Sequence, residues 1–183
     1  MKNKQPKTVD LTKFKKLWKT KKSLEQVEDK ELWQEILKDY RPKTHKPQWS
    51  VTWKDLADRV FSEYVRLLDA DERWMCKCVT CGRTMPWTEI QNWHFVTRWN
   101  LKYRFEKMNA NCQCYTCNCI LNWNYQKYTL YMIDKYGREF VEAMLSDKTI
   151  REIKQYEYEE MIKNWYSEIQ QLKTTKIPLD IHN

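Results

Sequence analysis

Hydrophobic side chains in this sequence recur mostly at the spacing of an α-helix. The clearest case is residues 52–70, where apolar positions repeat at helical spacing and Thr52 or Ser50 is placed to cap the first turn. Three further segments show the same periodicity: residues 24–40, 126–145 and 149–172. We therefore expect four helices, each with an apolar stripe that packs into a core.

The segments between these helices are polar or irregular. Prolines interrupt residues 41–49, which predicts a linker, and residues 146–148 predict a break between the last two helices. Residues 1–22 hold nine lysines and one acidic residue, so this stretch is either a flexible basic arm or contains a short helix over residues 11–18. Its charge serves either DNA contact or solubility alone.

Residues 76–125 contain all seven cysteines and lack helical periodicity at their start. They predict loops and short strands, followed by a helix that begins near Cys117. The expected organisation is a basic N-terminal extension over residues 1–48, a lead-in helix and cysteine-rich core over 49–125, and a helical region with a tail over 126–183.

The chain has only two glycines, Gly82 and Gly137, among its 183 residues. Two glycines cannot form a Gly-rich phosphate loop or a dinucleotide-binding fingerprint, so we expect no nucleotide cofactor. They also argue against a β-sandwich with many tight turns. The predicted fold class is α+β, mostly helical, with little sheet.

The net charge of +8 favours a polyanionic partner, with nucleic acid the first choice and an acidic membrane surface the second. No apolar run approaches the roughly 20 residues of a membrane span, and the first lysines are not followed by the apolar stretch of a secretory signal. We therefore expect a cytoplasmic protein with no membrane partner. In that compartment cysteines are metal ligands or free thiols more often than disulfides.

Two Cys-x-x-Cys pairs, Cys78 with Cys81 and Cys114 with Cys117, predict a closed tetrahedral site for a structural Zn²⁺. Two residues between thiolates allow both sulfurs to bind one ion at about 2.3 Å, and two pairs leave no open position for chemistry. Buried free thiols are the alternative. The remaining cysteines are interpreted as spare thiols: Cys76, Cys112 and Cys119. A second possibility is that Cys76, and not Cys78, is one of the four zinc ligands.

The 32 residues between the two pairs exceed the roughly 15–20 of a simple zinc ribbon and leave room for a hairpin. This insertion contains His94, whereas His45 lies in the linker and His182 near the C-terminus. A packed, hydrogen-bonded histidine is the simpler interpretation of His94, and a catalytic role depends on its neighbours. Asn118 directly follows the last paired cysteine, and Asn122 follows four residues later. On a helix their amide oxygens share a face and can reach one hard cation such as Mg²⁺.

The order of His94, Asn109 and a Cys-x-x-Cys pair followed directly by Asn118 resembles the HNH (ββα-metal) nucleases that carry two zinc knuckles. The resemblance implies a small zinc-stapled ββα-metal core with flanking α-helices. It also implies that His94 is the general base and that Asn109 orients it. Asn118 and Asn122 would then bind a catalytic Mg²⁺ or Mn²⁺.

Further motifs follow one another over residues 53–170: Ser62-Glu-Tyr-Val-Arg-Leu-Leu-Asp-Ala70, Cys78-Val-Thr-Cys-Gly-Arg83, His94-Phe95, Arg104-Phe105, Asn109, Gln113-Cys-Tyr-Thr-Cys-Asn118 and Asn124-Tyr125. Their order is similar to that of the NinG/Rap phage recombination nucleases. This resemblance implies metal-dependent cleavage of branched DNA, of the Holliday-junction or D-loop type, in the cytoplasm of a bacterial host. A junction resolvase cuts two strands, so a homodimer is also implied.

One position departs from the HNH pattern. Trp93 precedes His94 where many HNH enzymes carry an Asp or His that binds the metal. Either the ion keeps more water ligands, or Glu89 or Gln91 reaches it. Trp93 also supports the alternative function, a catalytically inactive zinc-knuckle module that binds DNA, and a recombination or replication scaffold is a third interpretation.

Basic residues flank the proposed site and are candidates for contacts with DNA phosphates: Arg83, Arg98, Lys102 and Arg104. Solvated surface charge is the plain alternative for the same residues.

Overall fold

The computed structural model describes residues 27–40 and 52–176. The basic arm, the linker with His45, Ser50, and the C-terminal residues with His182 lie outside the described residues. The chain divides into two compact units, residues 1–56 and 57–183.

In the first unit, the described residues form α1 (Val27–Asp39) and the first turn of α2 (Trp53–Asp69). Thr52 caps α2, as expected. Its hydroxyl accepts a hydrogen bond from the Asp55 N–H at 3.2 Å, and the Asp55 carboxylate accepts one from the Thr52 N–H at 3.0 Å. Trp33 of α1 packs edge-on against Trp53, with 5.2 Å between ring centroids.

The second unit continues α2 and adds ten elements. They are β1 (Met75–Lys77), β2 (Thr84–Pro86), β3 (Gln91–His94), η3 (Lys107–Asn109), β4 (Ala110–Gln113), η4 (Thr116–Ile120), η5 (Asn122–Asn124), α3 (Tyr125–Tyr136), α4 (Arg138–Ser146) and α5 (Gln155–Thr175). The α+β, mostly helical class is confirmed. None of the helices in the described part of the chain has the length and apolar character needed to cross a membrane.

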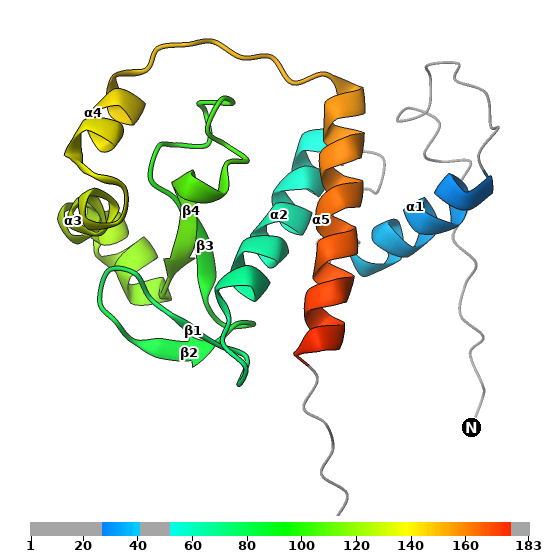
Figure 1. Ribbon diagram of the computed structural model, residues 1–183, viewed down its shortest axis with the longest axis horizontal. Coiled ribbons are helices and arrows are strands. Elements are labelled where there is room, and N and C mark those ends of the chain that lie inside the picture. The colour runs from blue at the N-terminus through cyan, green and yellow to red at the C-terminus, as the bar shows by residue number, and fades with distance from the viewer. Residues whose placement is uncertain (1–26, 41–51, 177–183) are drawn as a thin grey trace, which may run out of the picture. The chain divides into compact units, whose positions relative to one another are not determined.

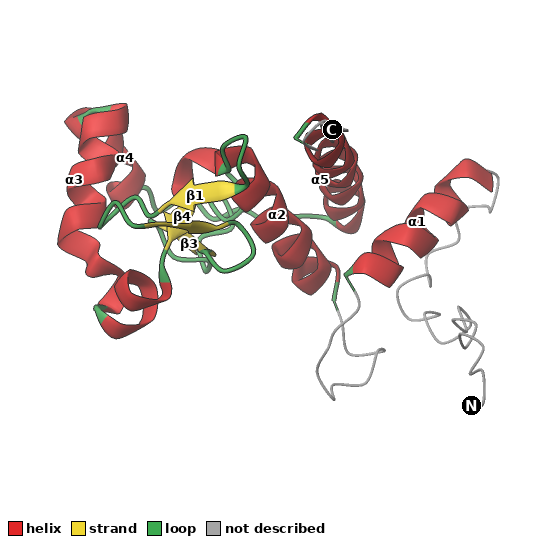
Figure 2. Ribbon diagram, turned by 90° about the horizontal axis from the view of Figure 1, so that it is seen from below, coloured by secondary structure: helices red, strands yellow, loops and turns green. Residues whose placement is uncertain are grey.

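The strands form two antiparallel two-stranded sheets, β1–β2 and β3–β4. In the second sheet Gln91 pairs with Gln113 and His94 with Ala110. Within this unit the hairpins lie between α2 with α5 on one side and α3 with α4 on the other (Figures 1 and 2). The sheet β3–β4 therefore has a helix-covered face on each side.

Two of the long helices expected from periodicity need correction. The helix expected over residues 126–145 is two helices, because Gly137 has φ 86° and ψ 154° and interrupts the backbone between α3 and α4. The helix expected over 149–172 begins only at Gln155, and an extended connection precedes it (Figure 1). The Glu157 carboxylate accepts a hydrogen bond from the Lys154 N–H at 2.7 Å, which fixes this later start.

Helix α5 runs beside α2 in the same direction (Figure 1). The rings of Phe61 and Trp165 are 4.8 Å apart, and Lys173 forms an ion pair with Glu63 at 2.7 Å. Beyond the end of α5, the Lys176 ammonium donates to the Leu67 carbonyl at 2.7 Å and to that of Ala70. The Leu67 carbonyl also accepts from the Ala70 N–H at 3.3 Å, so this lysine adds a charged donor that caps the C-terminal end of α2.

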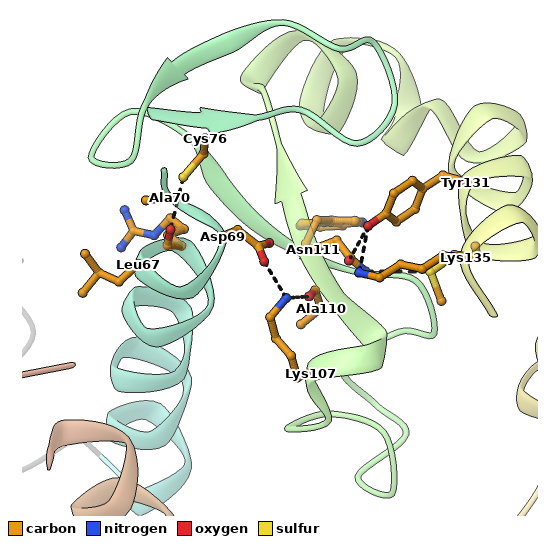
Figure 3. Close-up of polar contacts among 12 residues, drawn as sticks. Leu67, Asp69, Ala70, Cys76, Lys107, Ala110, Asn111, Tyr131 and Lys135 are labelled. Carbon is orange, nitrogen blue, oxygen red and sulfur yellow. Dashed lines mark hydrogen bonds and ion pairs between the residues drawn. The ribbon is translucent and has the colours of Figure 1, made fainter. Parts of the chain in front are cut away.

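Polar contacts tie β4 to the helices on both sides (Figure 3). The Lys107 ammonium, just before β4, binds the Asp69 carboxylate of α2 at 2.9 Å. On the other side the buried Asn111 amide donates to the Tyr128 hydroxyl at 3.1 Å and accepts from the Tyr131 hydroxyl at 3.3 Å. Both bonds join β4 to α3, so the strand is held in register from two directions.

The long connection between β3 and β4 is anchored to α2 by an ion pair. The Arg104 guanidinium donates to both carboxylate oxygens of Asp58, at 2.8 and 2.5 Å, and also to the Arg98 carbonyl. Only 8% of the Arg104 side chain is exposed, against 20% for Asp58. Such a pair contributes little net stability over an apolar pair, but loss of one partner leaves a buried charge.

We predict that Asp58→Asn lowers the free energy of unfolding by about 3 kcal/mol, because Arg104 would stay buried without its counter-ion. Urea unfolding at neutral pH measures the change. Glu152→Gln is the matched control, since Glu152 and Lys154 form a pair whose side chains are 77% and 56% exposed. An unchanged midpoint for Asp58→Asn would contradict this role for the pair.

Candidate functional site

The two Cys-x-x-Cys pairs form one cluster. The first pair follows β1 and the second brackets the start of η4. The sulfurs of Cys78, Cys81, Cys114 and Cys117 all lie within 4.8 Å of one another, and those of Cys81 and Cys114 are 3.7 Å apart. A tetrahedral zinc with sulfur ligands at about 2.3 Å separates them by about 3.8 Å. The cluster could therefore hold one zinc ion, with Cys78 rather than Cys76 in the set.

The surroundings of Cys78 favour a thiolate. Burial raises the pKa of this thiol, but hydrogen bonds from the Thr80 hydroxyl and from nearby backbone N–H groups outweigh burial and lower it to about 6. The Thr80 oxygen lies 3.2 Å from the Cys78 sulfur and accepts a hydrogen bond from the Gln113 amide at 3.4 Å. That amide directs the hydroxyl proton toward the sulfur, as partners behind metal ligands often do.

The three other cysteines separate into two environments. Cys76 and Cys112 are buried together with Ala70 and Ile90, and the Cys76 thiol donates to the Arg66 carbonyl at 3.1 Å. Cys119 is exposed and its sulfur lies 3.6 Å from the Gln91 side-chain oxygen. None of the three belongs to the four-sulfur cluster, which agrees with their interpretation as spare thiols.

His94 ends β3 and faces α2, where its ring centroid lies 6.2 Å from that of Phe61. Its Nε2 is 2.7 Å from the Arg104 carbonyl oxygen. A carbonyl can only accept, so Nε2 carries the proton and the lone pair is on Nδ1. Burial lowers the pKa of His94 to about 4, and the charges of Arg98 and Arg104 add to the effect. The ring is therefore neutral at pH 7, with one basic nitrogen.

Asn109 organises the connection between β3 and β4. Its amide nitrogen donates to the Val96 and Tyr103 carbonyls, both at 2.9 Å, and its oxygen accepts from the Val96 N–H at 2.6 Å. These bonds use both amide hydrogens and one acceptor position of the oxygen, and none of them reaches the His94 ring. Within the described contacts, Asn109 therefore fixes the backbone that follows His94 and does not touch the His94 side chain.

Asn118 lies in the wall of an open pocket of about 430 Å³. The pocket is lined by Ser62, Arg66, Ile90, Gln91, Asn92, Trp93, Arg98, Asn118 and Cys119. The Asn118 amide nitrogen donates to Gln91 at 2.5 Å, but its buried oxygen has no hydrogen-bond partner in the structure. The side-chain oxygen of Asn92 is likewise buried and has no hydrogen-bond partner in the structure. A buried amide oxygen without a donor is costly, so both are suited to a water or a cation.

The structure does not bring all the predicted site residues together. His94 is not among the residues that line the pocket, and neither is Asn122. The helix expected from Cys117 is a π-helical turn, η4, followed by three residues with positive φ, and the regular helix α3 starts only at Tyr125. Asn118 and Asn122 therefore do not share the face of one α-helix, and Asn122 is exposed.

The four predicted phosphate contacts differ in accessibility. The prediction that Arg104 contacts DNA phosphates needs correction. This residue is 6% exposed and its guanidinium is paired with Asp58, so it is not a surface contact. Lys102 forms an ion pair with Asp147 that is partly exposed. Arg83 and Arg98 are exposed, and Arg98 also lines the pocket.

Some pocket residues were not found from the sequence. Ser62 and Arg66 come from α2 and belong to the motif over residues 62–70, but no role in the site was predicted for them. Because Trp93 cannot bind a metal, the sequence offered Glu89 or Gln91 as a substitute ligand. Gln91 lines the pocket and contacts Asn118, whereas Glu89 does not line the pocket. Trp93 instead stacks on Trp123, with 5.8 Å between ring centroids.

Comparison with known proteins adds a family assignment. The model of the bacteriophage lambda NinG protein family matches residues 2–175. The chain belongs to the NinG family. Searches of curated proteins and of solved structures gave no significant match. The NinG match spans the four-sulfur cluster, both sheets and all the helices described above.

We predict that Cys114→Ser in this NinG-family chain reduces bound zinc from about one ion per chain to well below one and unfolds the surrounding hairpins. Structural zinc sites contribute folding free energy directly, so the metal and the local fold are lost together. Metal analysis and near-UV circular dichroism measure the two effects. Cys119→Ser removes a sulfur outside the cluster and should retain both; full zinc content in Cys114→Ser would argue against the assigned ligands.

We also predict that His94 does not titrate between about pH 5.5 and 8, because burial holds its pKa near 4. The folded protein disfavours protonation of His94, whereas the unfolded chain does not. The contribution of neutral His94 to the free energy of unfolding is therefore complete above pH 6.5 and is lost as the pH falls toward 4. NMR of the three histidine rings tests this, with His94→Gln to assign the signal. A midpoint near the unperturbed value of about 6.5 for His94 would show that the ring is solvated.

Proposed function

We propose that this NinG-family protein is a metal-dependent DNA endonuclease of the HNH (ββα-metal) type that acts on branched DNA during phage recombination. The observation that carries the proposal is the buried oxygen of Asn118, which has no hydrogen-bond partner in the structure and belongs to a residue that lines the pocket beside β3. The succession of β3, β4, the short turns η4 and η5, and α3 also supports the proposal, because the sequence resemblance implies two strands followed by a helix.

In this proposal His94 accepts a proton from the attacking water. The Arg104 carbonyl holds the proton of Nε2, so the lone pair that takes up the water proton is on Nδ1. The depressed pKa guarantees the neutral form at pH 7, and the approach of a phosphate anion raises that pKa toward the range suited to a base. Asn109 acts indirectly, by fixing the backbone on both sides of the connection that carries Arg104.

The Asn118 and Asn92 oxygens would hold a Mg²⁺ or Mn²⁺ ion, with Gln91 adjacent and the remaining positions filled by water. Such an ion supplies charge stabilisation for the phosphate and the leaving oxygen. Asn122 would join only through water or a local rearrangement, because it lies outside the pocket. A zinc ion in the cysteine cluster would keep β4 and η4 at a constant distance and take no part in the chemistry.

Arg83 and Arg98 are the exposed cations that would bind DNA phosphates, with Lys102 in a secondary position. Cleavage of both strands at a junction requires two active sites, so we expect a homodimer on DNA. The expected place of action is the cytoplasm of the phage's host.

A second candidate function is a catalytically inactive DNA-binding module or scaffold. It is favoured by Trp93, which stacks on Trp123 where a metal ligand is expected, and by the position of His94 against Phe61 rather than in the pocket. The cysteine cluster and basic charge serve this function equally well.

We predict that the purified protein, with its zinc retained, cuts a labelled four-way junction only when Mg²⁺ or Mn²⁺ is added. His94→Ala should reduce the cleavage rate at least about 100-fold, since a general base contributes 10²–10⁴-fold, while junction affinity stays within about threefold. His182→Ala is the control for loss of a histidine to which no role is assigned. Binding without cutting under either metal would favour the inactive module, and wild-type cutting by His94→Ala would remove His94 from the mechanism.

A further inference from the structure

Trp99 is an unusual surface residue. Its side chain is 89% exposed, the highest value for a tryptophan in the described part of the chain, where the next is Trp123 at 43%. Tryptophan is a large apolar side chain that is highly buried on average, and exposure forgoes the stabilisation that burial provides. The exposure of this indole indicates a binding partner that covers it.

The backbone that carries Trp99 is a braced turn. The Thr97 carbonyl accepts a hydrogen bond from the Asn100 N–H at 3.0 Å, and the Asn100 carbonyl accepts one from the Tyr103 N–H at 3.2 Å. The Asn100 side chain also accepts from the Lys102 N–H at 3.1 Å. Trp99 therefore sits at the tip of a turn with its own internal hydrogen bonds.

The ends of the same turn are held by buried side chains. The Arg104 guanidinium binds the Arg98 carbonyl, next to Trp99, while it pairs with Asp58 of α2. Asn109 clamps Val96 and Tyr103 on the two sides of the turn. A rigid support reduces the ordering cost of any contact that Trp99 makes.

Charge indicates the partner of this surface. Arg98, adjacent to Trp99, is exposed and also lines the pocket that contains Asn118. A cation beside an exposed indole matches a nucleotide, whose phosphate is anionic and whose base has two flat faces. In a linear duplex those faces are covered by neighbouring bases, whereas a branch point or single strand exposes them.

We propose that Trp99 stacks on the exposed face of a base at the branch of a DNA substrate while Arg98 binds a neighbouring phosphate, so that this turn distinguishes branched DNA from linear duplex. The inference rests on the proposed function and deepens it, because it assigns the selection of branched DNA to a residue outside the candidate catalytic set.

The test is a binding measurement made without added Mg²⁺ or Mn²⁺, so that cleavage does not enter. A four-way junction, a single strand and a linear duplex are compared, with 2-aminopurine at the branch to report stacking. Trp99→Ala is expected to weaken junction and single-strand binding by roughly 5- to 150-fold and to leave duplex binding within about twofold. Trp99→Phe should restore most of the affinity, because it keeps an aromatic face.

Tyr156→Ala is the matched control, since Tyr156 is a 65%-exposed aromatic residue of α5 outside this turn. Equal affinity of Trp99→Ala and wild type for the junction, or equal loss on junction and duplex, overturns the proposal. A change in the oligomeric state of Trp99→Ala, measured by sedimentation, also overturns it, because Trp99 would then belong to a protein interface. Failure of the wild type to bind any of the three DNAs overturns it as well. Selective binding without cleavage on later addition of metal would support the stacking role while the nuclease proposal fails.

Discussion

The four-sulfur cluster is the constraint on which the other features depend. The two sheets have strands of only three or four residues, and an isolated hairpin of that size is marginal in water. The cluster joins the end of β1 to the end of β4, and the Val79 N–H adds a hydrogen bond to the Cys112 carbonyl at 3.0 Å. Because β4 pairs with the strand of His94 and leads into Asn118, the same cluster positions both candidate catalytic groups.

Local patterns in the sequence predicted the elements whose causes are local. The apolar stripe and the Thr52 cap indicated α2, and cysteine spacing indicated the four-sulfur cluster, because both depend on residues a few positions apart. The break at Gly137 was missed, although a glycine inside a helical pattern is a known signal of an end. The late start of α5 was missed because helical periodicity continues into the extended connection before Gln155.

Features that depend on distant partners were beyond such patterns. Arg104 stands among other basic residues in the sequence, but Asp58, 46 residues earlier, draws it into the interior. The family resemblance implied that Asn109 orients His94, but no local pattern indicated that its side chain contacts Val96 and Tyr103. Similarly, the pocket beside Asn118 includes Ser62 and Arg66 only because the fold brings α2 close to β3 and η4.

The pairing of α2 with α5 has a consequence for the order in which the protein takes shape during synthesis. The Lys176 ammonium and the Leu67 carbonyl that it caps are 109 residues apart in sequence. On the ribosome α2 is made early, yet its partner helix and the cap of its last turn emerge only after both hairpins, α3 and α4. Until then the face of α2 that carries Phe61 has no α5 to cover it, and exposed apolar surface of this kind is prone to aggregation. The fold is thus completed only when α5 has been made and can pack against α2, which lies far from it in the sequence.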